Sequence, residues 1–449
     1  MKREVRDVLA FSFSLCLIAV MLTCNHILSK YPKVIPFIAL YMFEIVWILI
    51  SVVYIEHGTY VAEIADISYW TGASLRFILV IIPFIFCAPR FFYHMIKKRR
   101  IRSLVFGNVK NYNNILFGIA VFICLYVFLN IVVSGSVLTN NAITKGNFYS
   151  QYSKLPGADV LGAAYLKVAV LILGMFYWEN NTKKFTKNLA VLFFILAVLS
   201  KVGIGEKFYG IYTLVFYFVL YKLYLVFDKM EKGHHLRIKY IIYCGIGFCI
   251  IFLLVYQLGY VRSSKLEYLK AFTKTNNAID AMLSRTLSLQ GHTWWGIDKN
   301  IISSGKIWGD FDQLLAEIKA ALLNVSVYDS NIGLGRVMFE VAPSNIASNY
   351  LANHSRFYGG YWVVMLPCLG YLGTSVLSIG VAYLFSMIYF TLYSSIKANN
   401  SIGIVASMLY LLTFYEFFRI GNLSLLLGFR GIVCLMIILI MNTTYSRRL

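Results

Sequence analysis

The chain has 449 residues, of which 59% are hydrophobic and only 14% are charged. Soluble domains carry about a quarter charged residues, and long apolar runs recur here from end to end, so the composition excludes a soluble protein. The apolar runs do not alternate, which excludes a transmembrane barrel. The net charge of +21 lies largely in short loops between the runs, which is typical of a membrane protein and not of a nucleic-acid-binding domain.

The apolar runs predict an all-α polytopic integral membrane protein with about eleven transmembrane helices. The first run is followed by no small-residue cleavage site, so we expect a retained helix and not a signal peptide. Pro367 interrupts the apolar stretch before the ninth span, and a broken or re-entrant helix is expected at 360–369. The predicted spans are 8–28, 36–54, 71–92, 114–135, 160–178, 189–204, 208–227, 240–261, 370–393, 402–419 and 424–442.

Lysine and arginine in the short loops predict the orientation of the chain. With eleven spans, the basic loops fall on one side, the cytoplasm; they are 97–102, 183–187, 232–239 and 446–449. The N-terminal MKREVR disagrees, because an odd number of spans places it outside. Residues 1–449 are therefore expected to form one integral membrane domain. Residues 262–360 form one large polar loop on the external side, inserted between the eighth and ninth helices.

Arginine is the informative residue type, because ionised side chains in or near a bilayer are costly and tend to mark function. Six arginines are predicted at or near the external boundary of the membrane. A planar guanidinium makes paired, charged hydrogen bonds to pyrophosphate, so the set favours a polyanion site. The alternative for each single arginine is a snorkelling anchor at a helix end. The six are Arg262, Arg285, Arg336, Arg356, Arg419 and Arg430.

A short external hairpin, SKVGIGEKFYG at 200–210, adds Lys201, Lys207 and Glu206. Its glycines would let the backbone approach a ligand while the lysines supply positive charge. The alternative interpretation is a tight helical hairpin with solvated ends.

Two external histidines are candidates for a general base, since histidine titrates near neutral pH. They are His292 in QGHTWWGID and His354 in NHSRFYGG, and Glu206, Glu340 and Glu416 compete for the role.

Aromatic side chains near these histidines predict a platform for sugar rings. The candidates are Trp294, Trp295, Trp308 and Tyr361. The alternative is an aromatic belt at the membrane–water interface, where amphipathic rings prefer to lie.

No cofactor or metal is predicted. The sequence has no P-loop, no dinucleotide fingerprint and no zinc spacing, and its eight cysteines all lie within apolar runs. Asp310 and Asp312 in GDFD are a weak match to a metal-binding spacing.

Several short motifs resemble the bacterial Wzy-type O-antigen polymerases. They are the NHS tripeptide (353–355), the glycines at 359–360, the RIGNLS…R pattern at 419–430 and YVRSS after the eighth span. In its last third the chain is also similar to the enterobacterial common antigen polymerase. The hairpin at 200–210 departs from the family, which often carries an arginine where this chain has lysines.

The resemblance implies a fold related to the GT-C membrane glycosyltransferases, in the bacterial inner membrane with the active site facing the periplasm. It implies a glycosyltransferase whose substrates are oligosaccharide repeat units on undecaprenyl pyrophosphate, with a chain-length regulator as a protein partner. We therefore expect Arg262, Arg285 and Arg419 or Arg430 to bind pyrophosphate. His354 or His292 would take the acceptor proton, and the aromatic loop would hold sugar.

Two alternatives remain open at the level of the sequence. An O-antigen ligase shares the span number, the late external loop and the type of donor. A flippase or secondary transporter would instead place charged residues near the middle of several spans. The candidates for such charges are Glu44, Arg76, Lys167 and Lys222.

Overall fold

The structure of the protein is a computed structural model. It describes residues 18, 22–23, 26–27, 30–98, 109–137, 148–206, 208–231, 266–274, 278–323, 325–326, 329–352, 355–397 and 401–446.

Within these ranges the chain is helical almost throughout, which confirms the predicted fold class. Seven described helices are long and apolar enough to cross a membrane. They are α2 (Ile35–Glu56), α3 (Ala73–Lys98), α4 (Val109–Ser134), α7 (Lys184–Gly203), α8 (Phe208–Glu231), α16 (Tyr361–Lys397) and α17 (Ser401–Ile420). The other described helical elements outside the polar loop are η1 (Pro32–Val34), η2 (Phe148–Tyr152), α5 (Ala158–Val160), η3 (Leu161–Tyr165), α6 (Leu166–Trp178), α18 (Ser424–Leu427) and α19 (Phe429–Ser446).

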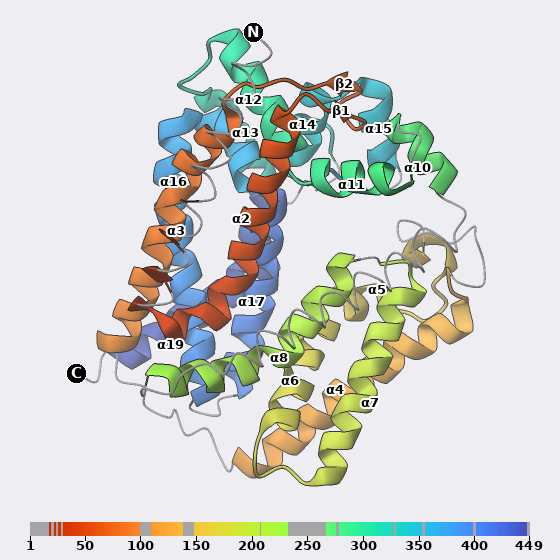
Figure 1. Ribbon diagram of the computed structural model, residues 1–449. Helices are drawn as coiled ribbons and strands as arrows, with labels where there is room; N and C mark the ends of the chain where they lie inside the picture. The colour runs from red at the N-terminus through yellow and green to blue at the C-terminus, as the bar shows by residue number, and fades with distance from the viewer. Residues whose placement is uncertain are drawn as a thin grey trace.

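Helices α2, α3, α16 and α17 pack together as one bundle, and α4, α6 and α7 form a second group beside it, with α8 between (Figure 1). Aromatic rings fill the first bundle: the ring centroid of Tyr41 lies 5.1 Å from that of Phe385 and 4.8 Å from that of Phe418. α6 and α8 approach closely at Gly174, where an added Cβ would lie 2.2 Å from the carbonyl oxygen of Phe218.

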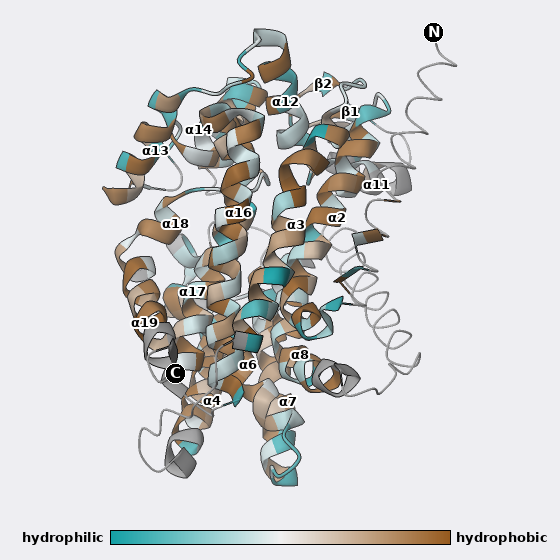
Figure 2. Ribbon diagram, turned by 90° about the vertical axis from the view of Figure 1, so that its left-hand side faces the viewer, coloured by the Kyte–Doolittle hydropathy of each residue, from teal (hydrophilic) through white to brown (hydrophobic). Residues whose placement is uncertain are grey.

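Most residues of these helices are apolar (Figure 2). On α4, exposed large apolar side chains recur every three or four residues at Ile115, Ile119, Phe122, Leu125 and Leu129. In water such a stripe would be buried against a partner element, whereas in a bilayer it contacts lipid. The protein is therefore built as an integral membrane protein.

The polar loop folds into short helices that cover one end of the bundle, and this assembly is here named the island (Figure 1). Its helices are α10 (Leu266–Thr273), α11 (Ala278–Ser288), α12 (His292–Ser304), α13 (Phe311–Leu322), α14 (Gly333–Val341) and α15 (Ser344–Ala352). Beside it lies a two-stranded antiparallel hairpin of β1 (Tyr60–Val61) and β2 (Asp66–Ile67), in which Tyr60 pairs with Ile67.

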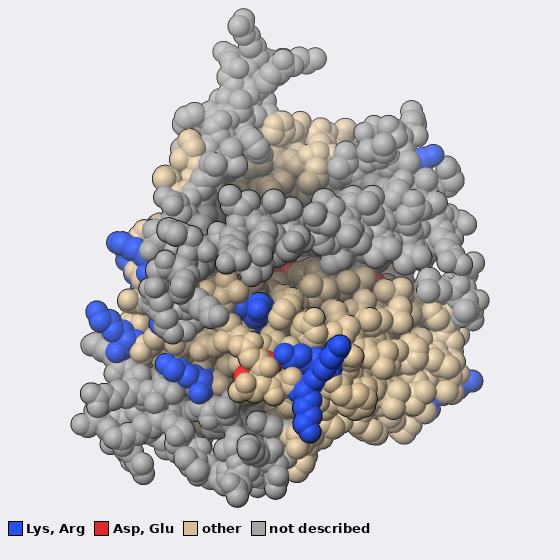
Figure 3. All heavy atoms as spheres, turned by 60° about the horizontal axis from the view of Figure 1, so that its bottom comes forward, with Lys and Arg blue, Asp and Glu red and all other residues tan. Residues whose placement is uncertain are grey.

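At the opposite end, lysine and arginine outnumber acidic side chains on the described part of the surface (Figure 3).

The helices follow the predicted spans closely where the apolar run is long, as in α2, α8 and α17. The prediction differs at α6, which begins at Leu166 after a π-helical turn, and at the last span, which divides into α18 and α19 at the extended Gly428. The predicted break near Pro367 lies at Gly370, whose φ of +66° interrupts α16. The predicted span at 240–261 and most of 8–28 lie outside the described residues.

Candidate functional site

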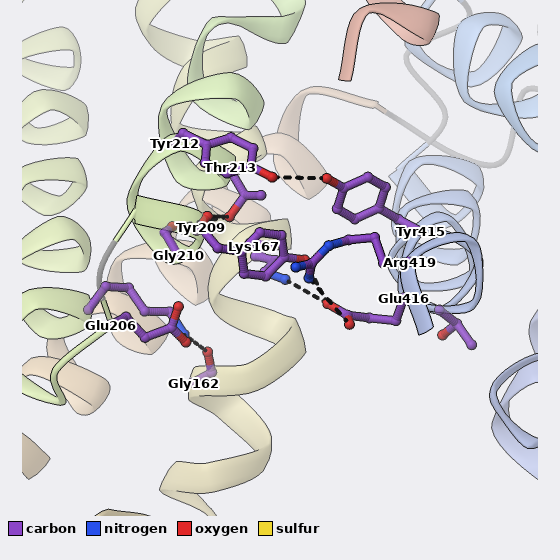
Figure 4. A network of polar contacts seen from close by, with 12 residues as sticks. Gly162, Lys167, Glu206, Tyr209, Gly210, Tyr212, Thr213, Tyr415, Glu416 and Arg419 are labelled. Atoms are coloured by element: carbon purple, nitrogen blue, oxygen red, sulfur yellow. Dashed lines mark hydrogen bonds and ion pairs between the residues drawn. The ribbon is translucent and has the colours of Figure 1, made fainter. Parts of the chain in front are cut away.

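Arg419 lies in the last turn of α17, within a buried group of charged and tyrosine side chains (Figure 4). Its guanidinium carbon is 3.6 Å from the ring centroid of Tyr209 on α8 and 4.9 Å from that of Tyr358. α17 ends directly after it, because Gly421 takes a φ of +85°, a left-handed conformation that favours glycine. The helix end and the two rings together fix the guanidinium in place.

Glu44 on α2 is the more deeply buried of two acids beside Arg419, with a side chain 5% exposed. Tyr212 and Tyr415 donate hydrogen bonds to its Oε1, and the Tyr358 hydroxyl donates to its Oε2 at 2.5 Å. Nε of Arg419 lies 3.6 Å from Oε1. The three hydroxyl donors and the facing cation offset the free-energy cost of burying this carboxylate. We therefore interpret Glu44 as a residue that orients Arg419.

Glu416 is the second acid, one turn before Arg419 on the same helix, and its side chain is 29% exposed. The Tyr209 hydroxyl donates to its Oε1 at 2.7 Å. Nζ of Lys167 on α6 lies 3.7 Å from Oε1, and Nη1 of Arg419 lies 3.8 Å from Oε2. These ion pairs are longer than hydrogen bonds, so among the described residues Glu416 does not occupy the N–H donors of either cation.

Residues 355–360, which connect α15 of the island to α16, cover this group on the side of the island. The amide of Gly360 donates to the backbone carbonyl of Arg419 at 2.6 Å, and Thr293 of α12 donates a hydrogen bond to the carbonyl of Tyr358. Burial raises the pKa of the Tyr358 hydroxyl well above its usual value, so it stays a hydrogen-bond donor. The island therefore holds Tyr358 against Glu44 and Arg419.

The predicted hairpin lies at the edge of the same group. Lys201 is buried, and its Nζ donates to the carbonyl oxygen of Gly162 at 3.1 Å and lies 3.2 Å from Oε1 of Glu206. Figure 4 draws Glu206 in the same group of polar side chains as Lys167 and Arg419. The structure thus brings the predicted residues Lys201 and Glu206 near Arg419, and Arg356 lies in the segment 355–360.

Two other predicted arginines lie in ion pairs that hold the island together. Arg285 pairs with the buried Glu63, and its Nη2 donates to the Tyr350 hydroxyl at 3.1 Å. Arg336 donates from Nη1 to Glu340 at 2.8 Å, and its Nη2 lies 3.5 Å from a carboxylate oxygen of Glu317. Their placement corrects the expectation that all six arginines face one polyanion site.

His292 is fully buried in the first turn of α12, with its ring centroid 4.7 Å from that of Phe357. Burial and the nearby charge of Arg285 lower the pKa of its imidazole to about 3. A base near neutral pH needs a higher pKa and access to a substrate proton, and the buried ring of His292 has neither.

Three of the four side chains predicted to form a sugar platform are also buried, whereas Trp308 is 82% exposed. Trp294, Trp295 and Tyr361 are each 0% exposed. Nε1 of Trp294 donates to the carbonyl of Ala73 at 2.9 Å, and Nε1 of Trp295 donates to that of Tyr69 at 3.1 Å. In this structure QGHTWWGID docks the island onto α3 and presents no aromatic face to a sugar.

The remaining predicted residues cannot be placed in the site. Arg262, Lys207 and His354 lie outside the described residues, as does the side chain of Arg430 in α19.

Sequence reasoning passed over two charges that the structure places at the centre. Glu44 and Lys167 can be recognised in the sequence, since each is a charged residue inside an apolar run. The sequence alone, however, presents them only as features of a transporter. Arg76 and Lys222, weighed with them, lie elsewhere: Nε of Arg76 donates to Asp298 at 2.7 Å, and Nζ of Lys222 lies over the Trp178 ring. Nothing in the sequence distinguishes the four tyrosines around Glu44 and Glu416 from the rest of the 33 tyrosines of the chain.

The assembled group suits transfer chemistry on an anionic substrate. Arg419 and Lys167 can bind and neutralise phosphate oxygens, and the partly exposed Glu416 can accept a proton. Lys167 lies at the start of the short apolar helix α6, and Glu416 and Arg419 lie in the last turns of α17, next to the segment 355–360.

Comparison with known proteins agrees with this chemistry. The family model for O-antigen polysaccharide polymerase Wzy matches residues 5–293, which is more than half of the chain. A family of unknown function, DUF6418, matches residues 328–435. No curated protein and no solved structure matches the chain significantly. By the first of these matches, the chain belongs to the Wzy family of O-antigen polysaccharide polymerases.

Proposed function

We propose that the protein joins undecaprenyl-pyrophosphate-linked oligosaccharide repeat units at the periplasmic face of the bacterial inner membrane. It transfers the growing chain from its carrier to the next carrier-linked unit. The observation that carries this proposal is the pair of cations Arg419 and Lys167, which flank Glu416 at 3.8 and 3.7 Å inside the membrane bundle.

The cations supply the site for the pyrophosphate of the donor. The Arg419 guanidinium has five N–H donors in a planar fork, which matches phosphate geometry. Arg419 and Lys167 are largely buried from water, with side chains 15% and 9% exposed, and charge stabilisation is stronger there than in bulk water. As the pyrophosphate leaves, its developing negative charge would therefore be stabilised by groups already in position.

Glu416 is the proposed base. The acceptor hydroxyl oxygen forms a bond to the anomeric carbon of the donor sugar, and its proton passes to the Glu416 carboxylate. The bond between that carbon and the pyrophosphate oxygen breaks, and the electron pair leaves with undecaprenyl pyrophosphate. Pyrophosphate bound by Arg419 and Lys167 would compete with Glu416 for these cations and free the carboxylate to accept the proton.

The surface charge supports this orientation. Basic side chains are retained preferentially on the cytoplasmic side, and they outnumber acidic ones on the described part of the end opposite the island (Figure 3). The island and the site beneath it would then face the periplasm, where the lipid-linked units are assembled.

The proposed function is tested by deleting the gene in the native bacterium and resolving its lipopolysaccharide on a gel. We expect the ladder to collapse to core plus a single repeat, with the wild-type ladder restored by the full chain from a plasmid. Loss of all O-antigen from the core, with accumulation of lipid-linked polymer, would identify a ligase instead. An unchanged ladder would overturn the proposal and favour a transporter.

A further inference from the structure

Helix α13 of the island is an amphipathic helix with its apolar face turned outward. The exposed fractions of Phe311, Leu315 and Leu322 are 65%, 51% and 65%. These residues are spaced by four and seven positions, so they lie along one face. The buried residues of the helix are Glu317, Ala320 and Ala321. In a helix of a soluble domain such large apolar side chains usually lie on the buried side, whereas here they are exposed together with Asp312 and Lys319.

The inward side of α13 is held by polar contacts. The carboxylate of Glu317 accepts a hydrogen bond from the amide of Gly333 at 2.7 Å and faces Arg336. Gln313, one turn earlier, accepts a hydrogen bond from Arg336 at 2.7 Å. The island therefore fixes which face of α13 points outward.

The start of α13 is clamped to the break in α16. Gly309 and Gly370 both have positive φ, and their backbones pack so closely that a Cβ on Gly370 would lie 2.2 Å from the carbonyl of Ile307. The amide of Asp310 donates to the carbonyl of Pro367 at 2.8 Å. This contact sets the depth of α13 relative to a membrane-spanning helix.

The apolar face of α13 continues the lipid-facing surface of its neighbours. α13 packs against α16 and α18 at the side of the bundle (Figure 2). Directly after the break in α16, Leu372 is 68% exposed, and Phe429 at the start of α19 is 86% exposed. Trp308, immediately before α13, is 82% exposed. Tryptophan at such a position is typical of the membrane–water interface.

We propose that α13 lies in the bilayer interface on the island side, with Phe311, Leu315 and Leu322 immersed in lipid and Trp308 at the headgroup boundary. Contact of an apolar face with water is unfavourable in free energy, and contact with lipid removes that cost. This part of the large polar loop is thus a membrane-surface element, and it places the island beside the lipids from which a carrier-linked substrate would arrive.

Photocrosslinking of the full-length protein in phospholipid vesicles tests the proposal. Benzoylphenylalanine replaces Leu315 in one variant and the exposed Ser348 of α15 in a matched control. After irradiation, mass spectrometry detects phospholipid adducts and a denaturing gel detects crosslinked dimers. We expect strong phospholipid adducts at 315 and few at 348.

A phospholipid adduct no stronger at 315 than at 348 would show that the face meets water. A crosslinked dimer at 315 would show that a second copy of the chain covers it, and either result would overturn the proposal. Polymer synthesis is not the readout, so the result does not depend on the roles assigned to Arg419 and Glu416.

Discussion

At the scale of single residues, the two acids of the site differ in how completely their neighbours satisfy them. Glu44 is 5% exposed and accepts hydrogen bonds from three tyrosine hydroxyls. Glu416 is 29% exposed and accepts from Tyr209 alone among the hydrogen bonds found within the described residues. Glu44 therefore has the contacts of a group that orients Arg419, while the carboxylate of Glu416 is the more accessible of the two.

This contrast predicts different outcomes for two matched substitutions. Glu416→Gln is expected to lower the turnover number about 10²–10⁴-fold with a much smaller change in KM, because it removes proton transfer and keeps the shape. Glu44→Gln is expected to cost about 1–3 kcal/mol in stability, because an amide cannot accept all three hydroxyl hydrogen bonds. Turnover assays and thermal unfolding in detergent separate the two effects.

Glu340→Gln is the control for loss of a carboxylate in the island, and we expect normal turnover from it. Normal turnover in Glu416→Gln would rule out Glu416 as the base.

The charged residues of the site could be anticipated from the sequence, and their neighbours could not. Arg419 and Glu416 stand in an apolar run, where an ionised group is costly unless it has a partner or a function. Glu44 and Lys167 carry the same signal. Their pairing across α2, α6 and α17 depends on tertiary packing, which no spacing in the chain records.

At the scale of elements, α12 shows why a motif that looks functional was misread. A histidine, two tryptophans and an aspartate in QGHTWWGID predicted a sugar-binding lid, but these side chains form the buried face of a docking helix. Asp298 accepts hydrogen bonds from Arg76 on α3 and from Tyr371 on α16, at 2.7 Å in both cases. Polar and aromatic side chains serve equally to bind a ligand or to bind a neighbouring helix, and sequence alone does not distinguish the two.

The contact between Gly309 and Gly370 gives a prediction at this scale. Gly370→Ala is expected to destabilise the protein by about 1–3 kcal/mol, because φ is +66° there and the new Cβ would meet the carbonyl of Ile307. Gly380→Ala on the same helix is the control, since a Cβ there would meet nothing within 4 Å. Thermal unfolding of both variants measures the difference, and equal melting temperatures would show that the clamp contributes nothing.

At the scale of the whole molecule, the site joins two separately matched segments of the chain. Glu44, Lys167 and Tyr209 belong to residues 5–293, and Tyr358 and Arg419 belong to residues 328–435. Each segment supplies one of the two cations that flank Glu416. The segment matched by the family of unknown function is therefore expected to contribute directly to the polymerase site.

The fold was more predictable than the site, because long apolar runs determine membrane-spanning helices almost by themselves. α17 was predicted at 402–419 and spans Ser401–Ile420. The predicted bounds were less accurate where the helix is too short to be identified by the length of its apolar run. These places are the 13-residue α6 and the last span, which is divided in two. The outward apolar face of α13 was hidden because a polar loop gives no sign of which side of its helices will meet lipid.

The most direct test of a pyrophosphate site at Arg419 is polymerisation by the purified full-length protein in vesicles, supplied with a lipid-linked repeat unit. Arg419→Ala is expected to slow polymerisation about 10²–10³-fold, because a charged donor to the leaving group is lost. Arg419→Lys should fall between that variant and the wild type, because it keeps the charge but not the planar fork. Arg90→Ala, at an exposed arginine on α3, should polymerise normally. Wild-type rates and polymer lengths from Arg419→Ala would contradict the central claim.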